Sequence, residues 1–154
     1  MDNNDIQKFL YQVAQSFKTK SLITKKKLEN GGYALFAVAP LVPDFCLTVT
    51  YFGGYKFLGT EIVSKDNKPV FGISYSGFFD EDLLRPDIDI ATAFLQMALA
   101  HTNEKLPIRG PQSYTENKYN YFNQIEGGID ECKGTEWISV NKNGHAEKIY
   151  QMKY

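Results

Sequence analysis

Three consecutive runs of β-branched and aromatic residues constrain the fold of this chain more than any other feature. The runs span residues 45–52, 55–64 and 68–77, and they are separated by Gly53-Gly54 and by Asp66-Asn67. A Gly-Gly pair accepts the positive φ angles that a two-residue hairpin turn requires, and Asp and Asn are also favoured in such turns. The sequence therefore predicts an antiparallel three-stranded unit at the centre of the fold.

Two-residue turns at both positions would fix how the three strands pair. That register places Val49 opposite Leu58, Cys46 opposite Glu61, and Glu61 opposite Gly72. Because successive side chains of a strand alternate between faces, it predicts Glu61 on a mixed polar face. The opposite face is apolar, and we expect it to form the core with Phe45, Leu47, Val49, Tyr51, Leu58, Thr60, Ile62, Phe71, Ile73 and Tyr75.

The surroundings of Glu61 on that mixed face suggest a shallow ligand site. Small residues there leave space beside the carboxylate, and a glycine inside a strand often marks the close approach of another group. Concave, aromatic-lined places with few polar groups are the usual form of small-ligand sites. The candidate ligand-binding residues are Glu61, Gly59, Gly72, Phe57, Phe52, Cys46 and Arg109.

A structural interpretation of the same residues remains open. Glu61 could be a solvated strand glutamate, or it could pair with Arg109. Arg109 lies in a proline-flanked connection, where its guanidinium could bind a ligand carboxylate or phosphate through two hydrogen bonds. It could equally tie its own loop to a glutamate or to backbone carbonyls, and this structural role is the one we favour.

The rest of the chain predicts a single α+β domain over residues 1–154. Helical spacing of apolar residues predicts helices at about 5–19 and at 90–102, and we treat the lysines at 18, 20, 25, 26 and 27 as a solvated turn. Further strands are expected at 33–39, 119–125, 135–140 and 146–152, with Trp137 opposite Tyr150 in the last hairpin. Together these elements predict a curved, mainly antiparallel sheet of about seven strands with two helices packed on it.

Composition and motif spacing argue against several functional classes. The net charge of −1 gives no electrostatic reason to expect nucleic acid or an anionic membrane as partner. No apolar run approaches the roughly 20 residues of a membrane-spanning helix. The two cysteines do not form a disulfide framework, which favours a cytoplasmic protein. The acidic segment 80–89 lacks the ligand spacing of a calcium loop, so we expect helix capping there, and no metal or cofactor.

A longer pattern of glycines, prolines and aromatic residues runs through the chain. It consists of Tyr51, Gly53, Gly54, Phe57, Gly59, Glu61, Val63, Pro69, Val70, Gly72, Tyr75, Gly77, Pro107, Arg109, Gly110, Pro111, Tyr114, Tyr119, Tyr121, Gly134, Glu136 and Ile138. This pattern resembles a bacterial family, domain of unknown function 5680, over roughly residues 30 to 150. The resemblance implies an α+β domain with no assigned activity, which occurs alone or behind an XRE-type helix-turn-helix. Only one predicted helix precedes the pattern, so direct DNA binding is not expected.

These observations lead to one functional expectation and two alternatives. We expect a non-catalytic module that binds a small molecule or a peptide on the Glu61 face. The first alternative is an enzyme in which Glu61 acts as general acid or base, with Arg109 or His101 as partner. The second is a protein-interaction domain, including one that forms a homodimer.

Overall fold

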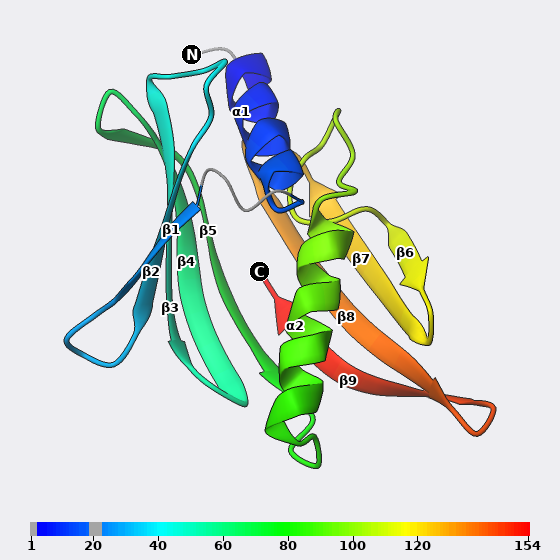
Figure 1. The fold of residues 1–154 in the computed structure, drawn as a ribbon. Helices are drawn as coiled ribbons and strands as arrows, with labels where there is room; N and C mark the ends of the chain where they lie inside the picture. Colours follow the sequence, from blue (N-terminus) through cyan, green and yellow to red (C-terminus); the bar gives the residue numbers. More distant parts are fainter. Residues whose placement is uncertain (1–2, 19–22) are drawn as a thin grey trace.

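The computed structural model describes residues 3–18 and 23–154, and there the chain forms one antiparallel sheet with two helices (Figure 1). This confirms the α+β class, although the sheet has nine strands rather than about seven. The strands lie in the order β1-β2-β3-β4-β5-β9-β8-β7-β6. The elements are α1 (Asn3–Ser16), β1 (Ile23–Lys27), β2 (Tyr33–Val38), β3 (Phe45–Gly53), β4 (Lys56–Lys65), β5 (Lys68–Phe79), α2 (Arg85–Leu99), β6 (Ser113–Glu116), β7 (Tyr119–Gly127), β8 (Cys132–Lys142) and β9 (His145–Lys153).

The two halves of the chain repeat the same order of elements. In each half a helix is followed by a strand at an outer edge of the sheet, and the next strands then run inward to its centre. The halves meet where β5 pairs with β9, through residues 76–79 and 150–153. The sheet bends at this junction, and both helices lie on one side of it, which we call the inner face (Figure 1).

Each helix covers one half of the inner face with its own apolar cluster. The apolar stripe of α1 packs on β2, β3 and β4, and that of α2 packs on β7, β8 and β9. Helix α2 begins at Arg85, earlier than predicted, because Pro86 is tolerated in the first turn of a helix. Helix α1 ends at Ser16; Thr19 and Lys20, included in the sequence predictions, lie outside the described residues.

The predicted register between β3 and β4 is wrong. The pair nearest the turn is Gly53 with Phe57, which leaves three residues between the paired positions instead of two, and Val49 pairs with Glu61, not with Leu58. Gly53, the last residue of β3, takes a φ of 101°, a conformation that favours glycine. The pairing moves by three positions, and an odd shift exchanges the two faces of β4.

The β4–β5 hairpin shows why the second register also fails. Its turn is the predicted one, because Asp66 and Asn67 have φ angles of 48° and 62° and Lys65 pairs with Lys68. A bulge between Val63 and Ser64 then moves the register by one residue, so that Glu61 faces Ile73 instead of Gly72. The side chain of Glu61 therefore belongs to the inner face, and the prediction of a mixed outer face around it is wrong.

The two strands that the sequence did not predict lie at the edges of the sheet. The strand β1 contains lysines that we had assigned to a solvated turn, and four of its five residues are exposed. Lysines are common on edge strands because they discourage pairing with other chains. In the terminal hairpin a bulge places Ile138 opposite Tyr150, so Trp137 stacks instead on Phe122, with 5.3 Å between ring centroids.

Candidate functional site

Arg109 occupies an unusual place in the loop between α2 and β6. Its φ of 63° is left-handed, and its carbonyl accepts a 2.5 Å hydrogen bond from the Thr102 hydroxyl. The next residue, Gly110, donates its N–H to the hydroxyl of Tyr121 at 3.1 Å. A Cβ at Gly110 would lie 2.6 Å from the Tyr121 ring, so the loop reaches this position only with glycine there. These contacts direct the guanidinium of Arg109 into the sheet.

The guanidinium binds two carboxylates that come from opposite halves of the sheet. Its Nε and Nη2 donate to the two oxygens of Glu136 on β8 at 3.1 and 2.7 Å, and Nη1 donates to Glu61 on β4 at 2.5 Å. The side chain of Arg109 is 10% exposed, that of Glu61 16%, and that of Glu136 0%. Arg109 therefore ties its loop to two glutamates, which is the structural role that we favoured from the sequence.

Two tyrosines complete the hydrogen bonding of Glu136. Tyr121 donates to its Oε2 at 2.8 Å and Tyr150 donates to its Oε1 at 2.7 Å. With the two bonds from Arg109, each oxygen of this fully buried carboxylate accepts two hydrogen bonds. A buried charge is stable only when its hydrogen-bonding capacity is met in this way. We call Arg109, Glu61, Glu136, Tyr121 and Tyr150 the central cluster.

The central cluster holds two acidic groups against one guanidinium, and this shifts the pKa values of its members. Burial raises the pKa of Glu61, and the nearby Glu136 adds to this, while Arg109 opposes it. Burial alone lowers the pKa of Arg109, but Glu136 and Glu61 raise it well above its usual value. Burial and then the charge of Glu136 raise the pKa values of Tyr121 and Tyr150 well above 10, so both stay protonated donors.

Glu61 lies at the solvent-exposed end of the central cluster. On the inner face it is flanked by Val49 and by the tyrosines 51 and 75, all half-buried. Tyr75 lies over Gly59, where a Cβ would meet its hydroxyl at 2.5 Å. Burial and then the charge of Glu61 raise the pKa of Tyr75. The exposed carboxylate edge therefore lies beside aromatic rings.

The structure divides the residues that the sequence predicted as one ligand site. Glu61, Gly59 and Arg109 meet on the inner face, and Phe57 lies on the same face, stacked on Tyr150 with ring centroids 5.8 Å apart. The remaining predicted residues are not near the Glu61 carboxylate on this face. Register places Cys46, Phe52 and Gly72 on the outer face, opposite Ser64, Leu58 and Ile62 respectively.

Glu136, Tyr121 and Tyr150 were missing from the predicted site. The sequence contains one signal for Glu136, because it alternates with Ile138 and Val140 in a predicted strand and so shares their apolar face. Glutamate is almost never fully buried unless it is paired, so this position indicated a buried partner.

Metal-binding clusters, a catalytic role for His101 and membrane-spanning helices find little support in the described residues. Among residues 3–18 and 23–154, no group of three or more His, Cys, Asp or Glu side chains could hold a metal ion. His101 is exposed just after α2, where its Nδ1 lies 2.8 Å from the Met97 carbonyl and its ring stacks on Tyr114. Neither helix in the described ranges has the length and apolarity needed to cross a membrane.

The fold and the central cluster define the class of protein: an α+β domain whose two sheet halves are joined through a buried arginine and two glutamates. The chain belongs to the family described as Domain of unknown function (DUF5680), whose model matches residues 49–154. The match contains Glu61, Arg109 and Glu136, and it begins within β3. No curated protein and no solved structure matches this chain.

Proposed function

We propose that this domain is a non-catalytic binding module that takes a small molecule at the Glu61 end of the central cluster. The observation that carries the proposal is the unequal exposure of the two carboxylates that share Arg109. Glu136 is fully buried and accepts four hydrogen bonds, whereas Glu61 is 16% exposed and is bound by Arg109 through one oxygen. Glu61 can therefore accept a further donor from solvent without any change in the buried part of the cluster.

The charge and the neighbours of Glu61 favour a ligand with a cationic or strongly donating group. With both carboxylates ionised, the three charged side chains of the central cluster sum to −1, so a positive group is attracted to the exposed carboxylate edge. The ammonium of Lys25 already lies over the neighbouring rings, 4.3 Å from the Tyr33 centroid and 5.7 Å from the Tyr51 centroid. The rings of Tyr51 and Tyr75 flank this edge, and Tyr33 stacks on Tyr51 with centroids 5.4 Å apart. Tyrosine faces bind cations as well as apolar groups. Organic amines with an aromatic or aliphatic body fit this description.

A thermal-shift and calorimetric screen of small molecules tests the proposal. It should contain organic amines, amino acids and nucleosides, with matched carboxylic acids as negatively charged counterparts. We expect binding of amines that is lost in Glu61→Gln and kept in Glu126→Gln, a control at an exposed glutamate paired with Lys133. Circular dichroism shows whether both variants are folded. If a detected amine binds Glu61→Gln as tightly as it binds the unchanged protein, the proposed site is wrong.

An enzyme that uses Glu61 as general acid is the second candidate. Burial raises the pKa of this carboxyl, as a proton donor near neutral pH requires, and Tyr75 lies close to it. The direct ion pair with Arg109 opposes that role because it favours the ionised carboxylate. Mass spectrometry of the screened compounds after incubation separates the candidates. A product formed by the unchanged protein and absent with Glu61→Gln would favour the enzyme.

The family resemblance also implies an association with transcriptional regulators, and this suits the proposed binding of a small molecule. The resemblance implies that some members of the family stand behind an XRE-type helix-turn-helix, and we propose that a ligand-binding domain in that position acts as a sensor. Its folded state would gain stability when the ligand binds.

A further inference from the structure

The sheet is open beside the junction of β5 and β9, because β5 continues there without a second neighbouring strand among the described residues. We call this opening the split. Strand β5 pairs with β9 only through residues 76–79. Residues 68–75 of β5 continue beyond this contact, paired to β4 on one side and, in the described chain, to no strand on the other. Beyond β9, Tyr154 exchanges two backbone hydrogen bonds with Gly134, at 2.8 and 3.0 Å.

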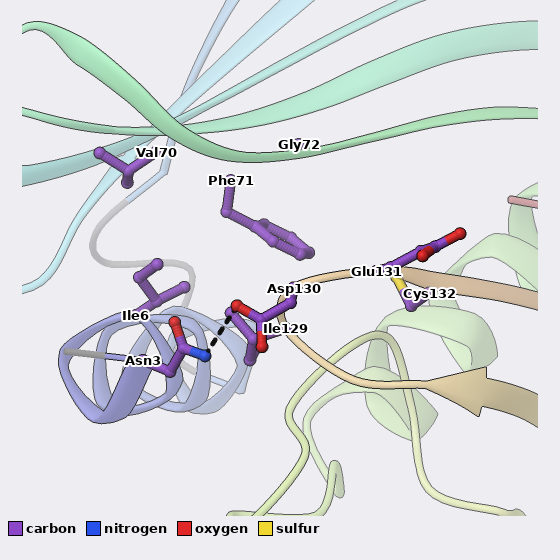
Figure 2. A pocket seen from close by; sticks show the side chains of 9 residues that line it. All are labelled: Asn3, Ile6, Val70, Phe71, Gly72, Ile129, Asp130, Glu131 and Cys132. Carbon is purple, nitrogen blue, oxygen red and sulfur yellow. Dashed lines mark hydrogen bonds between the residues drawn. The ribbon is translucent and has the colours of Figure 1, made fainter. Parts of the chain in front are cut away.

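A cavity of about 500 Å³ lies beside this free edge (Figure 2). Figure 2 shows β5 along one side of the cavity, helix α1 along another and the connection from β7 to β8 along a third. Ile6, Phe71, Ile129, Asp130 and Glu131 are among its lining residues. The Asn3 amide donates to Asp130 at 3.0 Å and so joins α1 to the connection.

The free edge of β5 offers backbone groups to a new strand. In an antiparallel pair the N–H and C=O groups of alternate residues point toward the partner, and the others point away from it. The groups of residues 70–75 that point away from β4 therefore face the split, where the described chain gives them no backbone partner. Pro69 has no N–H, so pairing would begin at Val70. This length suits a strand of about five or six residues.

The charges at the cavity indicate what kind of strand would fit. Asp130 and Glu131 are exposed there, and neither forms an ion pair within the described residues. Ile6, Phe71 and Ile129 supply apolar contacts in the same space. An extended segment that presents lysine or arginine to the two acids and an aliphatic side chain to these apolar residues matches both features.

We propose that the split binds a basic, extended peptide segment of another protein, which adds to β5 as a strand. Its main chain would pair with Val70–Tyr75, and its basic side chains would approach Asp130 and Glu131. Strand addition of this kind derives its affinity from main-chain hydrogen bonds and its specificity from alternate side chains.

Peptides of defined charge test the proposal directly. The probe is a fluorescent, capped hexapeptide of alternating valine and lysine, compared with the same peptide carrying glutamate for lysine. A third peptide keeps the lysines but has alternate backbone amides methylated, in both possible phases. We expect the lysine peptide to bind by fluorescence polarisation, and the glutamate peptide and at least one methylated form to lose binding. Amide hydrogen exchange in residues 70–75 should slow when the lysine peptide is bound.

Two variants locate the binding. In Asp130→Asn with Glu131→Gln, both exposed positions lose their charge, and we expect affinity for the lysine peptide to fall about three- to tenfold. Glu126→Gln, which changes an exposed acid paired with Lys133, should leave it unchanged. The proposal is overturned if the lysine peptide does not bind at millimolar concentration, or if the exchange protection appears outside residues 70–75. A dimer by light scattering that protects this edge without peptide would assign it to a second copy instead.

Discussion

Arg109 and Glu136 form a bidentate ion pair, 2.7 and 3.1 Å long, between a loop and the buried centre of the sheet. The same guanidinium reaches Glu61 from the other half of the sheet. The two glutamates lie on β4 and β8, and these strands flank the central pair β5 and β9. Arg109 therefore connects the two halves of the fold at the point where they meet.

Replacement of Arg109 by lysine should destabilise the protein although the charge is kept. A lysine ammonium cannot supply the planar pair of donors that Glu136 receives, nor reach Glu61 with the same geometry. Breaking a buried ion pair costs about 3–5 kcal/mol, and we expect Arg109→Lys to lose a large part of this in urea unfolding. Arg85→Lys, at an exposed residue paired with Asp89, is the control and should change stability little. A loss below about 1 kcal/mol in Arg109→Lys would contradict this account.

Gly110→Ala should be more harmful than a comparable change at another loop glycine. A Cβ at Gly110 would meet the Tyr121 ring at 2.6 Å, and the loop that carries Arg109 would have to move. Overpacking of this kind costs about 1–3 kcal/mol. At Gly128 a Cβ would meet no atom within 4 Å, so Gly128→Ala serves as the matched control. Equal unfolding free energies for the two variants would show that the loop is not held against Tyr121.

The Tyr150 hydroxyl should contribute measurably to stability through Glu136. Tyr150→Phe removes a 2.7 Å hydrogen bond and leaves one position of a fully buried carboxylate without a donor. The expected loss in unfolding free energy is about 1–3 kcal/mol. Tyr55→Phe, which loses a 2.7 Å bond to the Leu83 carbonyl at an exposed site, should cost less. The reverse order would indicate that Glu136 does not depend on Tyr150.

The raised pKa of Glu61 predicts a definite dependence of stability on pH. A carboxyl whose pKa is higher in the folded than in the unfolded state binds more protons when the protein is folded. Its contribution to the free energy of unfolding is therefore most favourable at pH values below its ordinary pKa of 4.5. That contribution is lost as pH rises from there through the raised pKa. We expect the unchanged protein to lose stability relative to Glu61→Gln over this interval. Urea unfolding of both proteins at several pH values measures the difference, and a relative gain with rising pH would contradict the direction.

The sequence predicted the elements of this fold better than their pairing. Asp66 and Asn67 take positive φ angles in the turn that was predicted there, and the terminal hairpin turns at Asn143-Gly144, between the two strands predicted at 135–140 and 146–152. The bulge between Val63 and Ser64 is not visible in the turn residues, because these set the pairing only next to the turn. The loop after Gly53 is longer than its Gly-Gly pair suggested, and this reversed the face assigned to Glu61.

The candidate site was accordingly predicted in part. Glu61, Gly59 and Arg109 come together on the inner face, and the pairing of Arg109 with Glu61 was one of the interpretations left open. The outer-face residues Cys46 and Phe52 entered only through the wrong register. The alternation of Glu136 with Ile138 and Val140 indicates burial, but it does not name the partners of Glu136. These come from a loop and from two other strands that only the folded sheet brings together.

The most direct test of the whole account is a double-mutant cycle between Arg109 and Glu136. Unfolding free energies are measured for Arg109→Met, for Glu136→Gln, for both changes together and for the unchanged protein. Because the two side chains share a buried bidentate pair, each single change should cost much more alone than in the presence of the other, with a coupling energy of about 2–3 kcal/mol. A coupling below about 0.5 kcal/mol would show that Arg109 does not hold the two halves of the sheet through Glu136.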